Sequence, residues 1–259
     1  MEDGFGENEE NKNIKPLNPF YFMKPKIAII GGSGFSELLE SLKSVKVKTK
    51  YGNPSDSIEV GVFSGKIIAF LPRHGKKRNI PPHMINHRAN IFALKKLGVK
   101  KIIGVTSVGS LKKRIKPPCV FVPNDYINLW NIQTYYEKKI AHITPGIDEN
   151  MRKIVVGQTK KVGAKIFEGI YVQTTGPRLE TKAEINLLKN YADVVGMNMA
   201  AEATLSKELG LRYVNISSVD NYANGIIKGS LTFEQILQNA RENSEEIKKI
   251  LKNVVKVIK

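Results

Sequence analysis

Short apolar runs that end in glycine and hydroxyl residues recur along this 259-residue chain, and they limit what it can fold into. The first run, residues 26–30, is followed at once by Gly31-Gly-Ser-Gly34. Residues 100–105 lead in the same way into Thr106-Ser-Val-Gly-Ser110. Apolar runs of this length that are bounded by glycine are buried strands more often than helices. Because helical patterns separate the runs, we predict a single α/β domain with a mostly parallel or mixed sheet.

The other elements follow from the periodicity of the apolar residues. A hairpin is predicted around Gly65, because apolar stretches flank this residue on both sides. The segment 128–150 is predicted to be a loop that serves as a lid or a subunit contact. The last segment reads as one long amphipathic helix. The predicted strands are 26–30, 58–63, 66–71, 100–111, 119–122, 165–174, 193–196 and 211–219, and the predicted helices are 85–97, 181–191, 200–209 and 233–258.

The first 23 residues differ from the rest of the chain. They are polar and acidic, and then rich in proline and asparagine. Such a composition cannot bury enough apolar surface to order itself. We therefore expect residues 1–23 to be a disordered extension and residues 24–259 to form the domain.

Composition and charge bear on the compartment and the partners. A membrane span is not expected, because apolar runs of about 18 residues are absent. A single cysteine, Cys119, and an N-terminus without a signal pattern favour the cytoplasm. The net charge of +17 suits an anionic partner, but the lysines are scattered and many lie near glutamates. We therefore expect a solvated basic surface and no nucleic-acid partner.

Polar residues gather where the predicted strands end, which is where open α/β sheets bind ligands. They form two sets. One set holds the cations and hydroxyls that suit a phosphate, and its members are Ser33, Arg73, His74, Thr106 and Ser107. The other set offers amide, carboxylate and apolar contacts that suit a nucleoside, and its members are Glu180, Met197, Asn198, Asp220 and Asn221.

Two alternative sites were weighed against these sets. The glycine turn after residue 30 begins like a dinucleotide-binding turn, but Glu37 stands where the third glycine belongs. His83 and His87 are four residues apart in a predicted helix, but Met84 stands where a zinc protease needs glutamate. No metal site is therefore predicted.

Seven segments in order give the chain a family resemblance that runs from about residue 26 to residue 258. The chain resembles the purine nucleoside phosphorylase superfamily, in particular its trimeric methylthioadenosine/methylthioinosine phosphorylase branch. The segments are Gly31-Gly-Ser-Gly34, Arg73-His-Gly75, Asn86-His-Arg-Ala-Asn-Ile-Phe-Ala-Leu94, Thr106-Ser-Val-Gly-Ser110, Thr175-Gly-Pro-Arg-Leu-Glu180, Gly196-Met-Asn-Met-Ala-Ala-Glu202 and Asn221-Tyr-Ala-Asn-Gly225.

The resemblance implies a barrel-like central sheet flanked by helices and a pentosyltransferase activity in purine salvage. The reaction would be the phosphorolysis of a purine nucleoside, with inorganic phosphate as co-substrate and no cofactor. Ser33, Arg73, His74, Thr106 and Ser107 would hold phosphate, with Asn198 at a position where the family has serine or threonine. Met197 would pack on the ribose. His142 would reach a neighbouring subunit's site, which implies a homotrimer or hexamer with sites at subunit interfaces.

The choice of base depends on two further positions. The branch of this family that acts on 6-oxopurines has asparagine where Asn221 stands and glutamate where Glu180 stands. A carboxylate accepts a hydrogen bond from the N1–H group that only a 6-oxopurine carries. Asp220 leaves an alternative, because a shift of one residue would restore the aspartate of the 6-aminopurine branch. The register with Asn221 also aligns Tyr222 and Ala223, and we favour it.

The 5′ side of the substrate is expected near Leu231 and Phe233, which suit an apolar methylthio group. The predicted substrate is therefore S-methyl-5′-thioinosine, with inosine and guanosine also possible. Three alternatives stay open at this stage. They are an S-methyl-5′-thioadenosine phosphorylase, a nucleosidase that uses water, and a non-enzymatic basic protein that binds nucleic acid.

Overall fold

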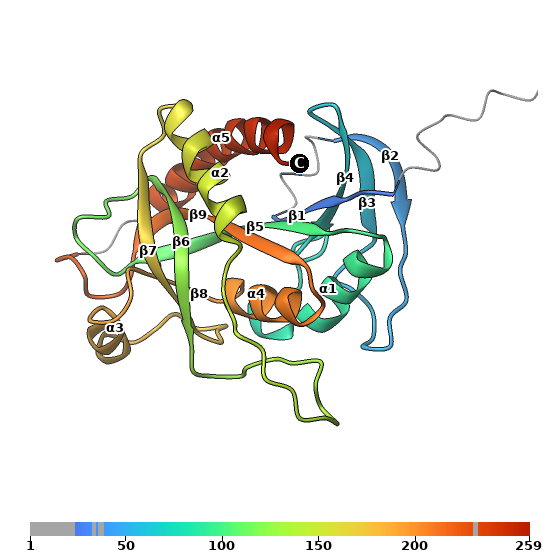
Figure 1. Ribbon diagram of the computed structural model, residues 1–259. Helices are drawn as coiled ribbons and strands as arrows, with labels where there is room; N and C mark the ends of the chain where they lie inside the picture. The colour runs from blue at the N-terminus through green and yellow to red at the C-terminus, as the bar shows by residue number, and fades with distance from the viewer. Residues whose placement is uncertain (1–23, 33–34, 36–38, 230–232) are drawn as a thin grey trace, which may run out of the picture.

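The computed structural model of the protein describes residues 24–32, 35, 39–229 and 233–259. The predicted disordered extension, residues 1–23, lies outside the described residues. Within the described part of the chain, strands and helices alternate around one mixed sheet (Figure 1). The strands are β1 (Ile27–Gly31), β2 (Glu40–Val45), β3 (Ile58–Phe63), β4 (Lys66–Pro72), β5 (Lys101–Ser110), β6 (Cys119–Asn128), β7 (Ile166–Gln173), β8 (Val194–Gly196) and β9 (Arg212–Tyr222).

Five of these strands close into a ring. The order is β5, β8, β7, β6 and β9, and β9 pairs back onto β5 along the whole length of β5. The pairings β5–β9, β6–β7 and β7–β8 are parallel, and the pairings β5–β8 and β6–β9 are antiparallel. The ring confirms the prediction of a barrel-like mixed sheet.

The remaining four strands extend the sheet from β5 as an open wing. β1 pairs in parallel with both β5 and β4, and the hairpin of β3 and β4 continues to β2. The first half of β5 pairs with β1, and its last two residues pair with β8 on the ring. β5 therefore belongs to both parts of the sheet.

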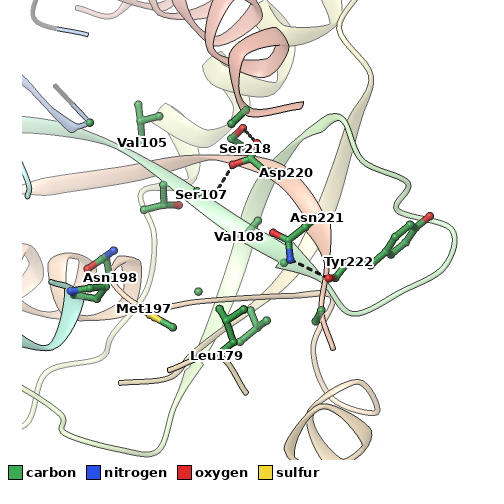
Figure 2. Close-up of a pocket in the computed structure, with 18 of the residues that line it drawn as sticks. Val105, Ser107, Val108, Leu179, Met197, Asn198, Ser218, Asp220, Asn221 and Tyr222 are labelled. Atoms are coloured by element: carbon green, nitrogen blue, oxygen red, sulfur yellow. Dashed lines mark hydrogen bonds between the residues drawn. The ribbon is translucent and has the colours of Figure 1, made fainter. Parts of the chain in front are cut away.

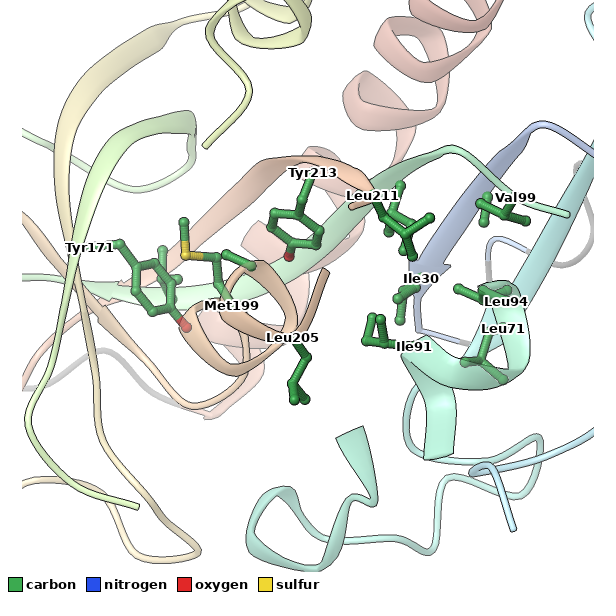
Figure 3. Packing of buried hydrophobic residues seen from close by; sticks show 14 of the residues in the cluster. Ile30, Leu71, Ile91, Leu94, Val99, Tyr171, Met199, Leu205, Leu211 and Tyr213 are labelled. Atoms are coloured by element: carbon green, nitrogen blue, oxygen red, sulfur yellow. The ribbon is translucent and has the colours of Figure 1, made fainter. Parts of the chain in front are cut away.

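Helices cover both faces of this sheet, which explains why its central strands are apolar on both sides. α2 (Glu149–Lys161) and α5 (Phe233–Val257) lie on one face, and α1 (His87–Lys96) and α4 (Met199–Glu208) lie on the other (Figure 1). β1 shows the consequence, because Ala28 and Ile30 belong to the α1–α4 core while Ile27 and Ile29 belong to the α2–α5 core. Figure 3 shows the α1–α4 core.

The helix starts have local chemical causes. The side chain of Asn86 accepts a hydrogen bond from the Ala89 backbone N–H (3.0 Å), so α1 begins at His87. A capping box of Thr181 and Glu184 begins α3 (Lys182–Leu188). Since α1 begins after residue 86, His83 lies in the separate 3-10 turn η3 (Pro82–Met84), and the prediction that His83 and His87 share a helix is wrong.

Most predicted elements are confirmed within a few residues, including the hairpin and the long last helix. Two strands run further than predicted, because each passes through a register shift. β6 continues beyond Pro123, and β9 continues through Asp220 and Asn221, which were expected in a turn. β2 and α2 were not predicted. Among the described residues, none of the helices is long and apolar enough to cross a membrane.

Candidate active site

A cavity of about 900 Å³ opens where β5 and β9 end, next to the turn between β8 and α4. This volume lies within the range of small-molecule sites. Figure 2 shows Met197 and Asn198 on one side, Asn221 and Tyr222 on the other, and Ser107 with Asp220 between them. The cavity brings together the predicted site residues Arg73, His74, Thr106, Ser107, Glu180, Met197, Asn198, Asp220, Asn221, Tyr222 and Ala223.

Arg73 follows β4 and is buried together with Glu202 of α4. Its Nε and Nη2 atoms donate to the two Glu202 carboxylate oxygens at 2.6 and 3.1 Å. Nη1 donates to the Val105 carbonyl, and Nη2 also donates to the Ile30 carbonyl. Four of the five guanidinium N–H groups are thus engaged within the protein. The guanidinium fork is thus directed at the Glu202 carboxylate, and the assignment of Arg73 to a bound phosphate stays a prediction.

A chain of buried polar groups runs from Glu202 towards β5. The Tyr213 hydroxyl donates to Glu202 (2.8 Å) and accepts from Asn215, whose side-chain oxygen accepts from Thr106 (3.2 Å). A Cβ atom on Gly104 would overlap the Tyr213 hydroxyl, so glycine leaves room for this chain. Thr106 is therefore held by the protein interior as well as lining the cavity.

His74 lines the cavity beside Arg73 and Glu202, and its imidazole ring is held in one tautomer. Its Nδ1 lies 2.8 Å from the Ile80 carbonyl oxygen, which can only accept, so Nδ1 carries a proton. Burial and the neighbouring Arg73 charge lower the pKa of His74, although the Ile80 contact opposes them. Nε2 is thus an acceptor in the neutral ring and a donor only in the imidazolium.

The turn from β8 to α4 places Met197 and Asn198. The side chain of Gln173 accepts from the backbone N–H groups of Ala200 (2.7 Å) and Ala201 (3.2 Å), so it caps α4 from a neighbouring strand. The Asn198 N–H donates to the Tyr171 hydroxyl (3.3 Å). The Asn198 side-chain oxygen is buried without a hydrogen-bond partner among the described residues. Its side chain is thus available to a ligand.

Asp220 lies at the centre of the cavity wall and is held by three donors. Ser107 donates to one of its carboxylate oxygens, and Ser218 and the Asn243 amide (3.1 Å) donate to the other. Val219 faces Val108 and Asn221 faces Gly109, so Asp220 is the extra residue of a β-bulge. Burial raises the pKa of Asp220, and the three hydrogen bonds oppose that rise.

Glu180 and Asn221 also line the cavity. Glu180 is buried, and its carboxylate accepts from the Thr174 hydroxyl at 2.5 Å. One amide N–H of Asn221 donates to the Tyr222 carbonyl (2.9 Å), which leaves a second N–H for a ligand. Together they offer the cavity a carboxylate acceptor and an amide.

Four predicted site residues are not placed at the cavity. His142 is exposed and does not line it. Ser33 and Leu231 lie outside the described residues, as does the side chain of Phe233.

Sequence reasoning missed Glu202, Gln173, Ser218 and Asn243, which hold the cavity residues in place. The motif quoted above contains Glu202, and its signal was a carboxylate among the apolar and small residues 199–203. Asn243 offered a weaker signal as an amide on the α5 face that also carries Ile247 and Leu251. The other two give no signal in the sequence.

Comparison with known proteins identifies the family. A sequence model of the phosphorylase superfamily matches residues 26–256. The chain belongs to this superfamily, as its motifs and its ring-shaped sheet indicated.

Individual relatives indicate which phosphorylases of this superfamily the chain is similar to. A probable 6-oxopurine nucleoside phosphorylase of Archaeoglobus fulgidus is 43% identical over 236 residues, which cover 90% of this chain and 96% of the relative. A probable S-methyl-5′-thioinosine phosphorylase of Methanocaldococcus jannaschii is 42% identical, with 88% and 91% covered. An S-methyl-5′-thioadenosine phosphorylase of Pyrococcus horikoshii is 40% identical, with 89% and 92% covered.

Solved structures agree with this assignment. A methylthioadenosine phosphorylase from an Antarctic soil metagenomic library superposes with a TM-score of 0.84 at 30% identity, covering 90% of this chain and 86% of that one. The methylthioadenosine phosphorylase of Schistosoma mansoni in complex with tubercidin gives a TM-score of 0.81 at 28% identity, with 91% and 92% covered.

Proposed function

We propose that the protein is a pentosyltransferase that cleaves a 6-oxopurine nucleoside with inorganic phosphate. The preferred substrate is S-methyl-5′-thioinosine, with inosine and guanosine also accepted, and the products are the free purine and a ribose 1-phosphate. The observation that carries the proposal is one cavity that joins His74, Thr106 and Ser107 to Glu180 and Asn221. Two of the relatives support it by name, a probable 6-oxopurine nucleoside phosphorylase and a probable S-methyl-5′-thioinosine phosphorylase.

Phosphate is assigned to the side of the cavity near His74 and Asn198. His74 offers Nε2, Asn198 offers its side-chain amide, and Thr106 and Ser107 offer hydroxyl oxygens, with Ser33 as a further hydroxyl residue. Arg73 contributes the one N–H that its contacts with Glu202 and the carbonyls leave. Because Arg73 and Glu202 together are neutral, the hydrogen bonds at this end carry more of the binding than net charge does.

The base is assigned to Glu180 and Asn221. The Glu180 carboxylate accepts the N1–H of a 6-oxopurine, and the second amide N–H of Asn221 donates to O6 or N7. A 6-aminopurine has no N1–H, so Glu180 would face a lone pair and disfavour it. Asp220 lines the cavity, but both of its oxygens are already held, which supports Asn221 as the residue that faces the base.

The reaction follows from these two ends. Cleavage of the C1′–N9 bond leaves positive charge on the sugar and negative charge on the purine. Bound phosphate stabilises the sugar cation, and one of its oxygens then forms the bond to C1′. The Asn221 amide stabilises the purine anion as an oxyanion hole does, until the base takes a proton. Met197, which lines the same cavity, is assigned to pack against the ribose.

The finer assignments belong to the same proposal. Leu231 and Phe233 cover the 5′-methylthio group. His142 serves a neighbouring subunit, in a homotrimer or hexamer whose sites lie at subunit interfaces. The enzyme works in the cytoplasm, and residues 1–23 form an extension outside the catalytic domain.

A substrate comparison tests the proposal. Purified protein is given methylthioinosine, inosine or methylthioadenosine, each with and without phosphate, and base release is measured. We expect release only with phosphate, and the highest kcat/KM for methylthioinosine. Preference for methylthioadenosine would overturn the base assignment, and release without phosphate would make the enzyme a nucleosidase.

A further inference from the structure

Asp220 has a consequence for Ser107 that the proposed function does not contain. We propose that Asp220 is a positioning residue, which fixes the Ser107 hydroxyl so that its oxygen meets the substrates only as a hydrogen-bond acceptor. Ser107 would then bind an O–H group of the substrates and would repel an oxygen that carries no proton. The inference rests on the proposed function and concerns the same cavity.

The single proton of the Ser107 hydroxyl is already engaged within the protein. A serine hydroxyl has one proton and two lone pairs. The proton of Ser107 lies in the hydrogen bond to one carboxylate oxygen of Asp220, while the side chain is exposed to the cavity. What Ser107 shows to the cavity is therefore the lone pairs of its oxygen.

The hydrogen bond from Ser107 to Asp220 resists change. Asp220 is 3% exposed, and among the described residues its carboxylate accepts hydrogen bonds from Ser107, Ser218 and Asn243. A buried carboxylate that loses one of its donors is left undersolvated, which is more costly than the loss of an average hydrogen bond. Rotation of the Ser107 hydroxyl towards a ligand is therefore disfavoured.

Substrate groups that carry a proton fit the acceptor that Ser107 presents. An acceptor in the cavity wall selects an O–H donor, and the two substrates offer two sources. One is a ribose hydroxyl of the nucleoside, and the other is the P–OH group of protonated phosphate. A fully ionised phosphate oxygen would place lone pairs against lone pairs.

The variant Asp220→Asn separates this role from a structural one. The oxygen that faces Asn243 must stay an acceptor, because the Asn243 amide nitrogen can only donate. The new amide therefore places its NH₂ group against Ser107, where it donates to the Ser107 oxygen. The Ser107 proton is then free to turn into the cavity, and Ser107 changes from acceptor to donor with little change in shape.

The experiment compares wild type, Ser107→Ala, Asp220→Asn and the double variant. The nucleosides are inosine, 2′-deoxyinosine and 3′-deoxyinosine, and the KM for phosphate is measured at about pH 6 and pH 8, because phosphate groups lose their second proton in this range. Ser44→Ala is the matched control, since Ser44 hydrogen-bonds Ser57 at an exposed position. Melting temperatures establish that the variants fold.

If a ribose hydroxyl is the donor, each single variant raises the KM for inosine about tenfold, as expected for one hydrogen bond. The deoxynucleoside that lacks the contacted hydroxyl shows no such rise, and kcat changes less than KM. If phosphate is the donor, Ser107→Ala raises the phosphate KM at about pH 6 and at about pH 8 alike, because the monoanion and the dianion of inorganic phosphate each keep a P–OH group, and the KM for inosine and its deoxy analogues stays near wild type. In either case Asp220→Asn has less effect once Ser107 is alanine.

The inference is overturned if Ser107→Ala leaves every KM within about twofold of wild type. It is also overturned if Asp220→Asn changes KM by the same factor in wild type and in the Ser107→Ala variant. Wild-type protein that releases no base with phosphate would contradict the proposed function instead. In that case the affinities of the same variants for inosine, its deoxy analogues and inorganic phosphate are compared by calorimetry.

Discussion

At the scale of single residues, Asn221 and Glu180 divide the recognition of the base between them. We predict that Asn221→Asp moves the ratio of kcat/KM towards adenine nucleosides, because a protonated aspartate can donate to N7. The shift should be about tenfold, the value of one hydrogen bond near a charged group. Base release from inosine and from adenosine measures it. An unchanged ratio would count against Asn221 as the residue that faces the base.

His87 gives a second prediction, which concerns stability. Its ring is buried beside Glu202 (Nδ1 to Oε1, 3.9 Å), and burial lowers the pKa of His87 from 6.5 to about 4. Between these two values the unfolded chain takes up a proton that the folded protein refuses. The His87 contribution to stability is therefore present above pH 6.5 and is lost as the pH falls towards about 4.

The free energy of unfolding should thus fall by about 2 kcal/mol more between pH 7 and pH 5 in wild type than in His87→Gln. Denaturant titrations at the two pH values measure this difference. His83→Gln serves as the control, because His83 is exposed, and it should keep the wild-type slope. Equal slopes in wild type and His87→Gln would show that His87 is protonated in the fold.

At the scale of elements, the start of α4 depends on a residue of another strand. Gln173→Ala removes the acceptor for the Ala200 and Ala201 N–H groups and should destabilise the protein by about 1–2 kcal/mol, as the loss of a helix cap does. Because Met197 and Asn198 precede this helix start, KM should rise as well. Urea unfolding and steady-state kinetics measure the two effects.

The exposed Gln238 of α5 provides a matched control for that variant, since Gln238→Ala truncates the same side chain far from the helix start. It should leave both the stability and the KM near wild type. If Gln173→Ala behaved like this control, the cap would not hold the turn that carries Met197.

Whether an element could be predicted depended on how regularly its apolar residues repeat along the sequence. β1, the hairpin of β3 and β4, and α5 were predicted because their apolar residues repeat with a clear period. α2 was missed because its buried residues Met151, Val155 and Thr159 include a threonine, which a search for apolar residues does not count. β9 was predicted too short because a bulge carries the strand through polar residues.

The site residues that could be predicted are those at the ends of the predicted strands. Ser107, His74 and Asn221 were found because each stands where an apolar run stops. How Arg73 uses its donors was not predictable, because its partner Glu202 is 129 residues away in the sequence. A sequence gives the chemical type of each group, while the direction of its hydrogen bonds depends on neighbours brought by other elements.

At the scale of the whole molecule, the segment 129–148 exposes a concentration of apolar side chains. Leu129, Trp130, Ile132 and Ile140 are 68%, 45%, 62% and 91% exposed. Apolar side chains gathered in this way mark a contact surface. We predict that wild-type protein sediments as a trimer or a multiple of it, and that Ile140→Asp shifts it to smaller species.

Because His142 lies in the same segment, Ile140→Asp should also raise the nucleoside KM. Val257→Asp is the matched control, since Val257 is an exposed apolar residue at the end of α5, and it should not change the sedimentation. Wild-type protein that sediments as a monomer would contradict the prediction.

The double membership of β5 affects how the molecule opens. Its backbone groups pair with strands of both the ring and the wing, so the two parts cannot separate without breaking hydrogen bonds of β5. We therefore expect hydrogen exchange of the β5 amides to require complete unfolding, while the outer strand β2 exchanges through local opening. Native-state exchange in low denaturant measures both, and the ring and the wing should show one common limit for their most protected amides.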